Sequence, residues 1–318
     1  MKGFVAAIAM LVVFAPGCQP QGSNRNRPLR FVFIPKALHI PVFHYARVAA
    51  EREAKRIGGI EIIWRGPETT DELRQKEILE AFIAQRVDGI AISCLNGDLL
   101  TDAIDRAVDS GIPVVTWDSD APKSKRLAFY GVNDFEAGKA LGEGLARLLG
   151  GRGKVALITA LGADNLQKRL DGARQALAQH PGIQIVEVFD IRDDAVRVSE
   201  VIATGTQRYP DLAGWLSVGG WPVFLRNALD PVDTTRTKVV AFDTIPPAPD
   251  LIRAGKVHLL IGQKYFGWGA ESVRLLHRLH RGERLDQPLQ YSGIDIVTAD
   301  NLNAYLEQWR QWEQGTQG

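Results

Sequence analysis

The chain has little cysteine, no apolar run long enough to cross a membrane and no excess of one charge. Its two cysteines, Cys18 and Cys94, are too few for the disulfide frameworks that hold small exported domains together. The N-terminal apolar run covers residues 4–15, fewer than the roughly 18 residues that a membrane-spanning helix needs. Without Lys2 the chain carries 37 basic and 37 acidic residues, a balance that argues against nucleic acid or an anionic membrane surface as the main partner. We therefore expect a small ligand without strong charge.

Motifs of common enzyme classes are also missing from the sequence. There is no Gly-x-Ser-x-Gly turn, no phosphate loop ending in Gly-Lys-Ser/Thr and no dinucleotide fingerprint after the first strand. His277 and His280 share a helix face, but no acidic or thiol side chain stands at a metal-ligand spacing from them. Gly138, Gly142 and Gly144 lie inside a helical pattern, where they favour close packing. The sequence thus predicts a binding protein rather than an enzyme, without a cofactor or a metal.

The N-terminus has the pattern of an export signal, with a basic residue, an apolar run and then small and polar residues. We assign residues 1–17 to a signal peptide and residues 18–29 to a tether, so that the mature protein works in the periplasm or cell envelope. Cys18 begins the tether and resembles the acylated cysteine of the bacterial lipoprotein lipobox, which implies a membrane contact through a lipid anchor. Ala15 and Pro16 depart from the usual lipobox residues. An ordinary cleaved signal with an incidental cysteine stays open as the alternative.

From residue 29 onward, short runs rich in β-branched and aromatic residues alternate with longer helical patterns. Strands are expected at residues 30–34, 60–64, 89–93, 113–117, 129–132, 154–159, 183–190, 214–218, 238–242, 258–262 and 294–297. Helices are expected at residues 43–57, 71–85, 99–110, 134–149, 166–179, 195–208, 268–281 and 301–312. Strands that are apolar on both faces and separated by helices predict parallel sheets covered on both sides.

The alternation starts again after residue 132, which predicts an α/β protein of two Rossmann-like, doubly wound lobes. The chain is expected to change lobes near Val132, Gln263 and Ile294, and these three crossing segments would form a hinge. This division assigns to the first lobe residues 30–132 and 264–294, and to the second lobe residues 133–263 and 295–318.

Two acidic residues end strands of nearly the same sequence. Val114-Val115-Thr116-Trp117 is followed by Asp118, and Val239-Val240-Ala241-Phe242 is followed by Asp243. Ligands of open parallel sheets bind beyond the carboxyl ends of the strands, where a carboxylate can accept two hydroxyl groups of a neutral polyol. Each Asp could instead cap the following turn. The occurrence of the pair, one in each lobe, favours ligand binding.

Other polar residues lie near strand ends and are expected to face the same cleft. Lys36 follows the first strand, Cys94 the third, and Gln263 the strand at residues 258–262. Arg169 stands one turn into the helix after residues 154–159, where a planar guanidinium could bond two sugar oxygens. A solvated helix charge is the alternative for Arg169.

Aromatic rings could cover the C–H faces of a sugar while its hydroxyl edges stay free to form hydrogen bonds. Phe43 opens the first helix, Trp221 follows the strand at 214–218, and Tyr265 and Trp268 flank Gln263. Each of these rings could equally be part of the core. Trp117 is assigned to packing.

These residues resemble the periplasmic sugar-binding proteins of the ribose, galactose and rhamnose type, the receptors of bacterial ABC importers, from residue 30 to about 298. The resemblance implies the type I periplasmic binding protein fold and a monosaccharide held by Asp118, Arg169, Asp243 and Gln263. A proline followed by aromatics in the first helix of that family is matched by Pro41-Val42-Phe43.

Phe33-Ile34-Pro35-Lys36 is closer to the rhamnose- and autoinducer-binding branch, which implies that Lys36 and Asp118 engage ligand oxygens. A second-lobe Asp-Gln pair of that branch is partly matched by Asp164 and Asn165. Where the family often has Asn-Asp, this chain has Gly219-Gly220-Trp221 and so lacks an amide group.

The resemblance also implies a monomer that delivers its sugar to an ABC permease. A sensor that receives a sugar or an autoinducer-type furanose without transport is the alternative. A lactose-type repressor shares the two-lobed domain but needs an N-terminal helix-turn-helix, and here the export signal takes that place.

Overall fold

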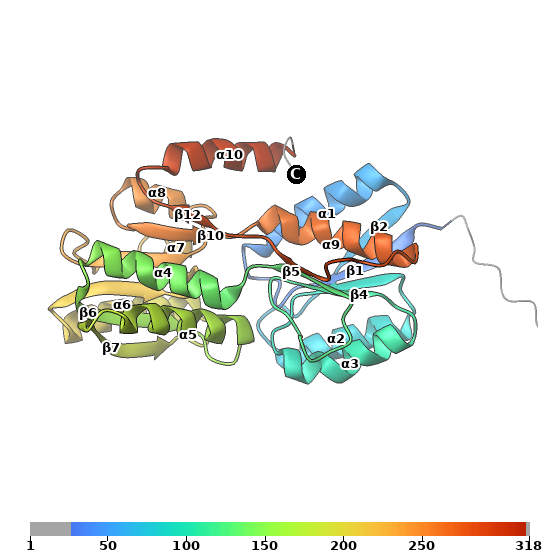
Figure 1. The fold of residues 1–318 in the computed structure, drawn as a ribbon, viewed down its shortest axis with the longest axis horizontal. Coiled ribbons are helices and arrows are strands. Elements are labelled where there is room, and N and C mark those ends of the chain that lie inside the picture. Colours follow the sequence, from blue (N-terminus) through green and yellow to red (C-terminus); the bar gives the residue numbers. More distant parts are fainter. Residues whose placement is uncertain (1–26, 316–318) are drawn as a thin grey trace, which may run out of the picture.

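The computed structural model describes residues 27–315, so the predicted signal peptide, Cys18 and most of the predicted tether lie outside the described residues. Its elements form two α/β lobes joined side by side (Figure 1). The strands of lobe 1 are β1 (Leu29–Ile34), β2 (Ile60–Trp64), β3 (Gly89–Ile92), β4 (Val114–Trp117), β5 (Ala128–Gly131) and β11 (Leu289–Tyr291). Its helices are α1 (Phe43–Ile57), α2 (Glu72–Ala84), α3 (Gly97–Asp109) and α9 (Tyr265–His280).

Lobe 2 repeats this architecture. Its strands are β6 (Arg152–Thr159), β7 (Gly182–Asp190), β8 (Leu212–Ser217), β9 (Lys238–Phe242), β10 (Leu259–Gly262) and β12 (Asp295–Val297). Its helices are α4 (Asp134–Leu148), α5 (Asp164–Ala178), α6 (Ala195–Arg208), α7 (Trp221–Phe224) and α8 (Ala248–Arg253). The C-terminal helix α10 (Leu302–Gln314) follows β12.

The two sheets have matching strand orders, β11-β5-β4-β3-β1-β2 in lobe 1 and β12-β10-β9-β8-β6-β7 in lobe 2. All pairs are parallel except β10 with β12. The predicted fold class of two doubly wound lobes is thus confirmed. The chain passes between the sheets at three places, from β5 to α4, from β10 to α9 and from β11 to β12.

Successive side chains of a strand point to opposite sides, so the apolar strands of lobe 1 supply buried residues to both faces of its sheet. Phe31 and Phe33 pack in the cluster that includes Ala46 of α1, whereas Val32 and Ile34 pack with Leu79 of α2. Helices α1 and α9 therefore cover one face, and α2 and α3 cover the other (Figure 1).

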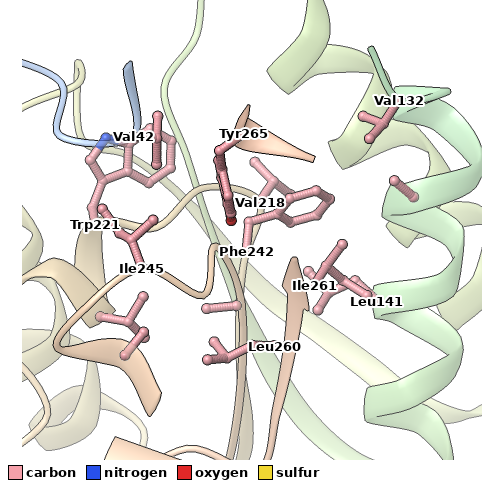
Figure 2. Packing of buried hydrophobic residues seen from close by; sticks show 14 of the residues in the cluster. Val42, Val132, Leu141, Val218, Trp221, Phe242, Ile245, Leu260, Ile261 and Tyr265 are labelled. Carbon is pink, nitrogen blue, oxygen red and sulfur yellow. The ribbon is translucent and has the colours of Figure 1, made fainter. Parts of the chain in front are cut away.

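In lobe 2, helix α4 lies on strands β8, β9 and β10. Leu141 of α4 meets Ile261 of β10, and Phe242 ends β9 next to this contact (Figure 2). The strands therefore end in a packed apolar layer, which fixes the positions of the polar residues that follow them.

Helices α4 and α5 cross at unusually short range because glycines face the contact. A Cβ atom added at Gly138 would lie 2.0 Å from the backbone oxygen of Arg169, and one added at Gly172 would lie 2.0 Å from that of Phe135. The close packing expected from the sequence at Gly138 and Gly142 is confirmed. The crossing sets the height of Arg169 above the sheet.

Three short elements were not expected from the sequence: β11, α7 and α8. Strand β11 has only three residues, two of them exposed, so it carries no apolar pattern. Helix α9 begins at Tyr265, three residues earlier than expected.

Helix α10 was assigned to lobe 2 but also contacts lobe 1. Arg52 of α1 donates to the carbonyl oxygens of Trp312 and Glu313 at 3.0 and 2.6 Å, and the ring of Trp309 packs edge-on against Tyr45. The helix thus bridges the lobes (Figure 1).

We expect Gly138→Ala to lower the free energy of unfolding by about 3 kcal/mol, because the added methyl group meets rigid backbone. Gly144→Ala in the same helix is the control. Its methyl group would meet only the flexible end of Leu259, and alanine favours the helix, so its effect should stay within about 1 kcal/mol. Urea unfolding of both variants measures this, and equal losses would contradict the proposed tight crossing.

Candidate functional site

A cavity of about 240 Å³ lies between the lobes, beyond the carboxyl ends of their strands. It takes residues from both sides. Lobe 1 contributes Lys36, Phe43 and Asp118, and lobe 2 contributes Asn165, Arg169, Trp221, Asp243 and Gln263. All of these were predicted from the sequence, and the structure brings them together.

Asp118 and Asp243 occupy equivalent places in the two lobes. Each follows the fourth strand of its lobe in chain order and donates its backbone N–H to the next strand, to Tyr130 at 3.1 Å and to Ile261 at 2.8 Å. Both have left-handed backbones, with φ of 59° and 72°, which is uncommon outside glycine. Such strain persists where the surrounding structure imposes it, and it clusters at functional sites. The two residues are 4% and 6% exposed.

The partners of Asp118 come from the ends of neighbouring strands. Its Oδ2 accepts a hydrogen bond from Ser93 Oγ at 2.7 Å and pairs with Lys36 Nζ at 3.0 Å. The same ammonium donates to Asn165 Oδ1 of lobe 2 at 3.1 Å. The backbone N–H of Gly97 also reaches across the cleft, to Asp164 Oδ2 at 3.4 Å. The lobes therefore touch across the cleft.

Arg169 is the centre of the polar network in lobe 2. It is 3% exposed and donates to Asp134 Oδ1 at 2.7 Å and to Gln263 Oε1 at 3.0 Å. Its guanidinium also lies 4.2 Å from the centre of the Phe242 ring. Gln263 in turn donates through Nε2 to Asp243 Oδ1 at 2.9 Å. The network holds Asp243 through a neutral amide rather than through the cation itself.

Burial dominates the acidity of the carboxyl groups in this network. It raises the pKa of Asp134 to about 6, against the opposing charge of Arg169. It also raises the pKa of Asp243, again against Arg169 and the hydrogen bonds of Gln263 and Tyr265. Both acids are thus held in an environment with little water.

Two residues expected at the ligand do not line the cavity. Cys94 is fully buried in the second apolar cluster of lobe 1, where burial raises the pKa of its thiol. Strand β3 ends at Ile92, and it is Ser93 that turns toward Asp118, because alternate side chains point to opposite faces. Asp164 lies at the cleft mouth, on Gly97.

The aromatic residues divide between cavity and core. Phe43 lines the cavity and rests edge-on against Trp117, with ring centroids 5.2 Å apart. Trp221 lines it from lobe 2, with Nε1 donating to Asp193 at 2.7 Å. Tyr265, Trp268 and Trp117 are buried behind the cavity wall, so packing is the role of Trp117, as expected.

Sequence reasoning missed Asp134 and Ser93. Asp134 opens α4 directly after Asn133, whose side chain caps the helix, so the pair resembles an ordinary helix start. Its contact with Arg169 depends on the close crossing of α4 and α5. The glycines in the two predicted helices are the only sequence signal for that crossing. They do not indicate which polar residues the crossing brings together.

A second cavity, of about 530 Å³, lies on the hinge side between α1, α9 and α10. Its charged groups already have partners: Arg274 pairs with Glu53 at 2.7 Å, Lys264 pairs with Asp295, and Arg52 donates to backbone carbonyl oxygens of α10. Within residues 27–315, no group of three or more His, Cys, Asp or Glu side chains is placed to hold a metal ion. No helix in that part of the chain has the length and apolarity to cross a membrane. The cavity between the lobes is therefore the candidate ligand site.

Comparison with known proteins shows which proteins the chain is similar to. Residues 31–284 match the family model described as a periplasmic binding protein domain. The xylose/arabinose-binding protein XylF of Sulfolobus acidocaldarius is 24% identical over 76% of this chain and 64% of its own length. The ribose import binding protein RbsB of Escherichia coli is 23% identical over 78% of this chain and 83% of its own.

Solved structures give the same result. A solute-binding protein of an ABC transporter from Burkholderia graminis, in complex with D-arabinose, has a TM-score of 0.83 and 31% identity, over 88% of this chain and 98% of its own. The glucose-galactose binding protein GanP of Geobacillus stearothermophilus has a TM-score of 0.81 and 25% identity, over 87% of this chain and 99% of its own.

We expect Asp134 to contribute stability that is lost as the pH rises. Its pKa is raised from 3.8 to about 6, so the contribution is complete below pH 3.8 and disappears as the pH passes 6. Asp134→Asn removes this titration and keeps the shape. The wild-type minus variant difference in the free energy of unfolding should therefore decrease between pH 4 and 7, as measured by urea unfolding at a series of pH values.

Glu53→Gln is the control of opposite sign. The hydrogen bond from Arg56 lowers the pKa of Glu53 to about 2, so its contribution is lost as the pH falls from 4.5 toward 2. A difference for Asp134→Asn that grows with pH would mean that the charge of Arg169 outweighs burial.

Proposed function

The chain belongs to the periplasmic binding protein domain family, whose members here are sugar-binding proteins of the ABC-transporter type, and from this premise we propose that it binds a neutral monosaccharide between its lobes and delivers it to an ABC permease. The members of this family are substrate-binding proteins rather than enzymes, and they work outside the cytoplasm.

The observation that carries the proposal is that Asp118 and Asp243 each use only one carboxylate oxygen for contacts within residues 27–315. The hydrogen bonds and ion pairs among residues 27–315 engage Oδ2 of Asp118 and Oδ1 of Asp243. The other oxygen of each group is left for a ligand in the cavity, one from each lobe. A sugar hydroxyl donates well to a carboxylate, so a polyol between the lobes would bond to both.

Charge and size support a neutral, compact ligand. The charges of Lys36 and Arg169, the two buried cations of the wall, are already matched by Asp118 and Asp134, so neither is left to neutralise an anionic ligand. The volume of about 240 Å³ is below the roughly 300 Å³ at which pockets for drug-sized ligands begin. A pentose is the ligand class to test first, because D-arabinose occupies the similar Burkholderia protein.

Rings on both sides would cover the sugar. Phe43 of lobe 1 and Trp221 of lobe 2 line the cavity, and their faces can bury the C–H surfaces of a pyranose or furanose. Rotation of the lobes about the three crossing segments would then exclude water from the site.

We expect Asp243→Ala to weaken sugar binding by about 2 kcal/mol, close to 30-fold in Kd, because a hydroxyl of the sugar loses a charged partner. Isothermal titration calorimetry with D-arabinose, D-ribose, D-xylose and D-galactose measures this. Asp250→Ala, at an exposed ion pair of α8, is the control and should leave the Kd unchanged. Wild-type-like affinity of Asp243→Ala for a sugar that the wild type binds would remove Asp243 from the site.

We also propose that Cys18 is acylated, which lies outside the described residues. Cys18→Ser should then release the protein from membranes in cell fractionation. Cys94→Ser is the matched control, since the buried Cys94 takes no part in anchoring and its variant should stay bound. Membrane association of Cys18→Ser would contradict the anchor.

A further inference from the structure

A chain of buried hydroxyl groups leads from the C-terminal helix to the ligand-facing carboxylate. Tyr305 of α10 lies 2.6 Å from Thr244 Oγ1, which lies 3.3 Å from the Tyr265 hydroxyl. The backbone N–H of Thr244 also donates to that hydroxyl, at 3.0 Å. Tyr265 donates to Asp243 Oδ1 at 3.0 Å. All four residues are at most 6% exposed.

The direction of these bonds follows from counting protons. A carboxylate only accepts, so the single hydroxyl proton of Tyr265 points to Asp243. A bond across the 3.3 Å between the Thr244 and Tyr265 hydroxyls can then only be donated by Thr244, and in that case Tyr305 donates to Thr244. Each bond in such a one-way series polarises the next, and the series ends on the charged group of the site.

The series also crosses between the lobes. Tyr265 opens α9 of lobe 1, while Thr244 and Asp243 follow β9 of lobe 2. Figure 2 shows the Tyr265 hydroxyl directed toward the end of β9, where Phe242 lies. At its other end the series begins on α10, which follows a lobe 2 strand and packs against lobe 1 (Figure 1).

Contacts at both oxygens restrict the rotation of the Asp243 carboxylate. Its Oδ1 accepts from Gln263 and Tyr265, while a Cβ atom added at Gly220 would lie 2.7 Å from its Oδ2. Gly220 lines the cavity, so the Gly-Gly that replaces the usual Asn-Asp makes room for Oδ2 beside the ligand.

We propose that Tyr265 is a positioning residue that turns the Asp243 carboxylate toward the sugar, and that Thr244 and Tyr305 make this orientation depend on the seating of α10. The inference rests on the proposed function, because it concerns the affinity of the same site. Tyr265 does not line the cavity and acts only through Asp243.

The test compares tyrosine variants that lose only a hydroxyl group. Tyr265→Phe should raise the Kd for the tightest-binding sugar of the four-sugar panel about 10-fold, because a buried hydrogen bond to a charged group is lost. Tyr305→Phe, remote from the cavity, should raise it in the same direction by less. Tyr45→Phe is the matched control, since its ring packs in the same aromatic cluster but its hydroxyl is not in the series.

A double-mutant cycle separates positioning from packing. If Tyr265 acts only through the Asp243 side chain, Tyr265→Phe should have little further effect in an Asp243→Ala background, where no carboxylate is left to position. Additive losses, or an unchanged Kd in Tyr265→Phe, would overturn the inference while wild-type binding upholds the proposed function. Failure of the wild type to bind any sugar of the panel would overturn the proposed function, and the inference with it. Thermal unfolding of each variant confirms that binding is measured on folded protein.

Discussion

Burying carboxylates without neutralising them is the constraint on which this structure depends. Asp118, Asp134 and Asp243 are nearly inaccessible to water, and an isolated buried charge costs far more than a folded protein can spare. Lys36 and Arg169 supply the compensating charges, while Ser93, Gln263 and Tyr265 supply neutral donors. Within residues 27–315, the partners of Asp118 and Asp243 bond to only one oxygen of each group, so the other oxygen is left for a ligand.

Arg169 shows how backbone packing produces this arrangement. Its guanidinium reaches both Asp134 and Gln263 because α5 lies against α4 with no side chain between Gly138 and the Arg169 backbone. A longer distance between the helices would withdraw Arg169 from Asp134 and leave two buried charges apart. A small residue that does not line the cavity thus determines the electrostatics of the cavity.

The sequence predicted the elements that depend on local pattern. The βα alternation follows from the hydrophobic pattern of the strands and helices. The positions after apolar strands predicted the equivalent pair Asp118 and Asp243, and also Lys36, Arg169 and Gln263. Predictions failed where a shift of one residue decides which side chain faces the cavity. Cys94 was expected there, but its neighbour Ser93 turns toward Asp118 instead. Predictions also failed where a contact is purely tertiary, as between Asp134 and Arg169. The contact of α10 with lobe 1 has no local signal either, because its aromatic face would suit either lobe.

The two sides of the hinge are held with unequal strength, and this asymmetry would suit the proposed opening and closing of the lobes. On the hinge side, aromatic rings of α10 pack against α1 and α9, and Arg52 holds the end of the helix. On the cleft side, the lobes meet through Lys36 with Asn165 and through a long bond from Gly97 to Asp164. Two such bonds contribute little net free energy, so a ligand bonded to both lobes can decide the balance between open and closed forms. Under the proposed function, a ligand bonded to Asp118 and Asp243, which lie on opposite lobes, would shift the population by its differential affinity for the closed form.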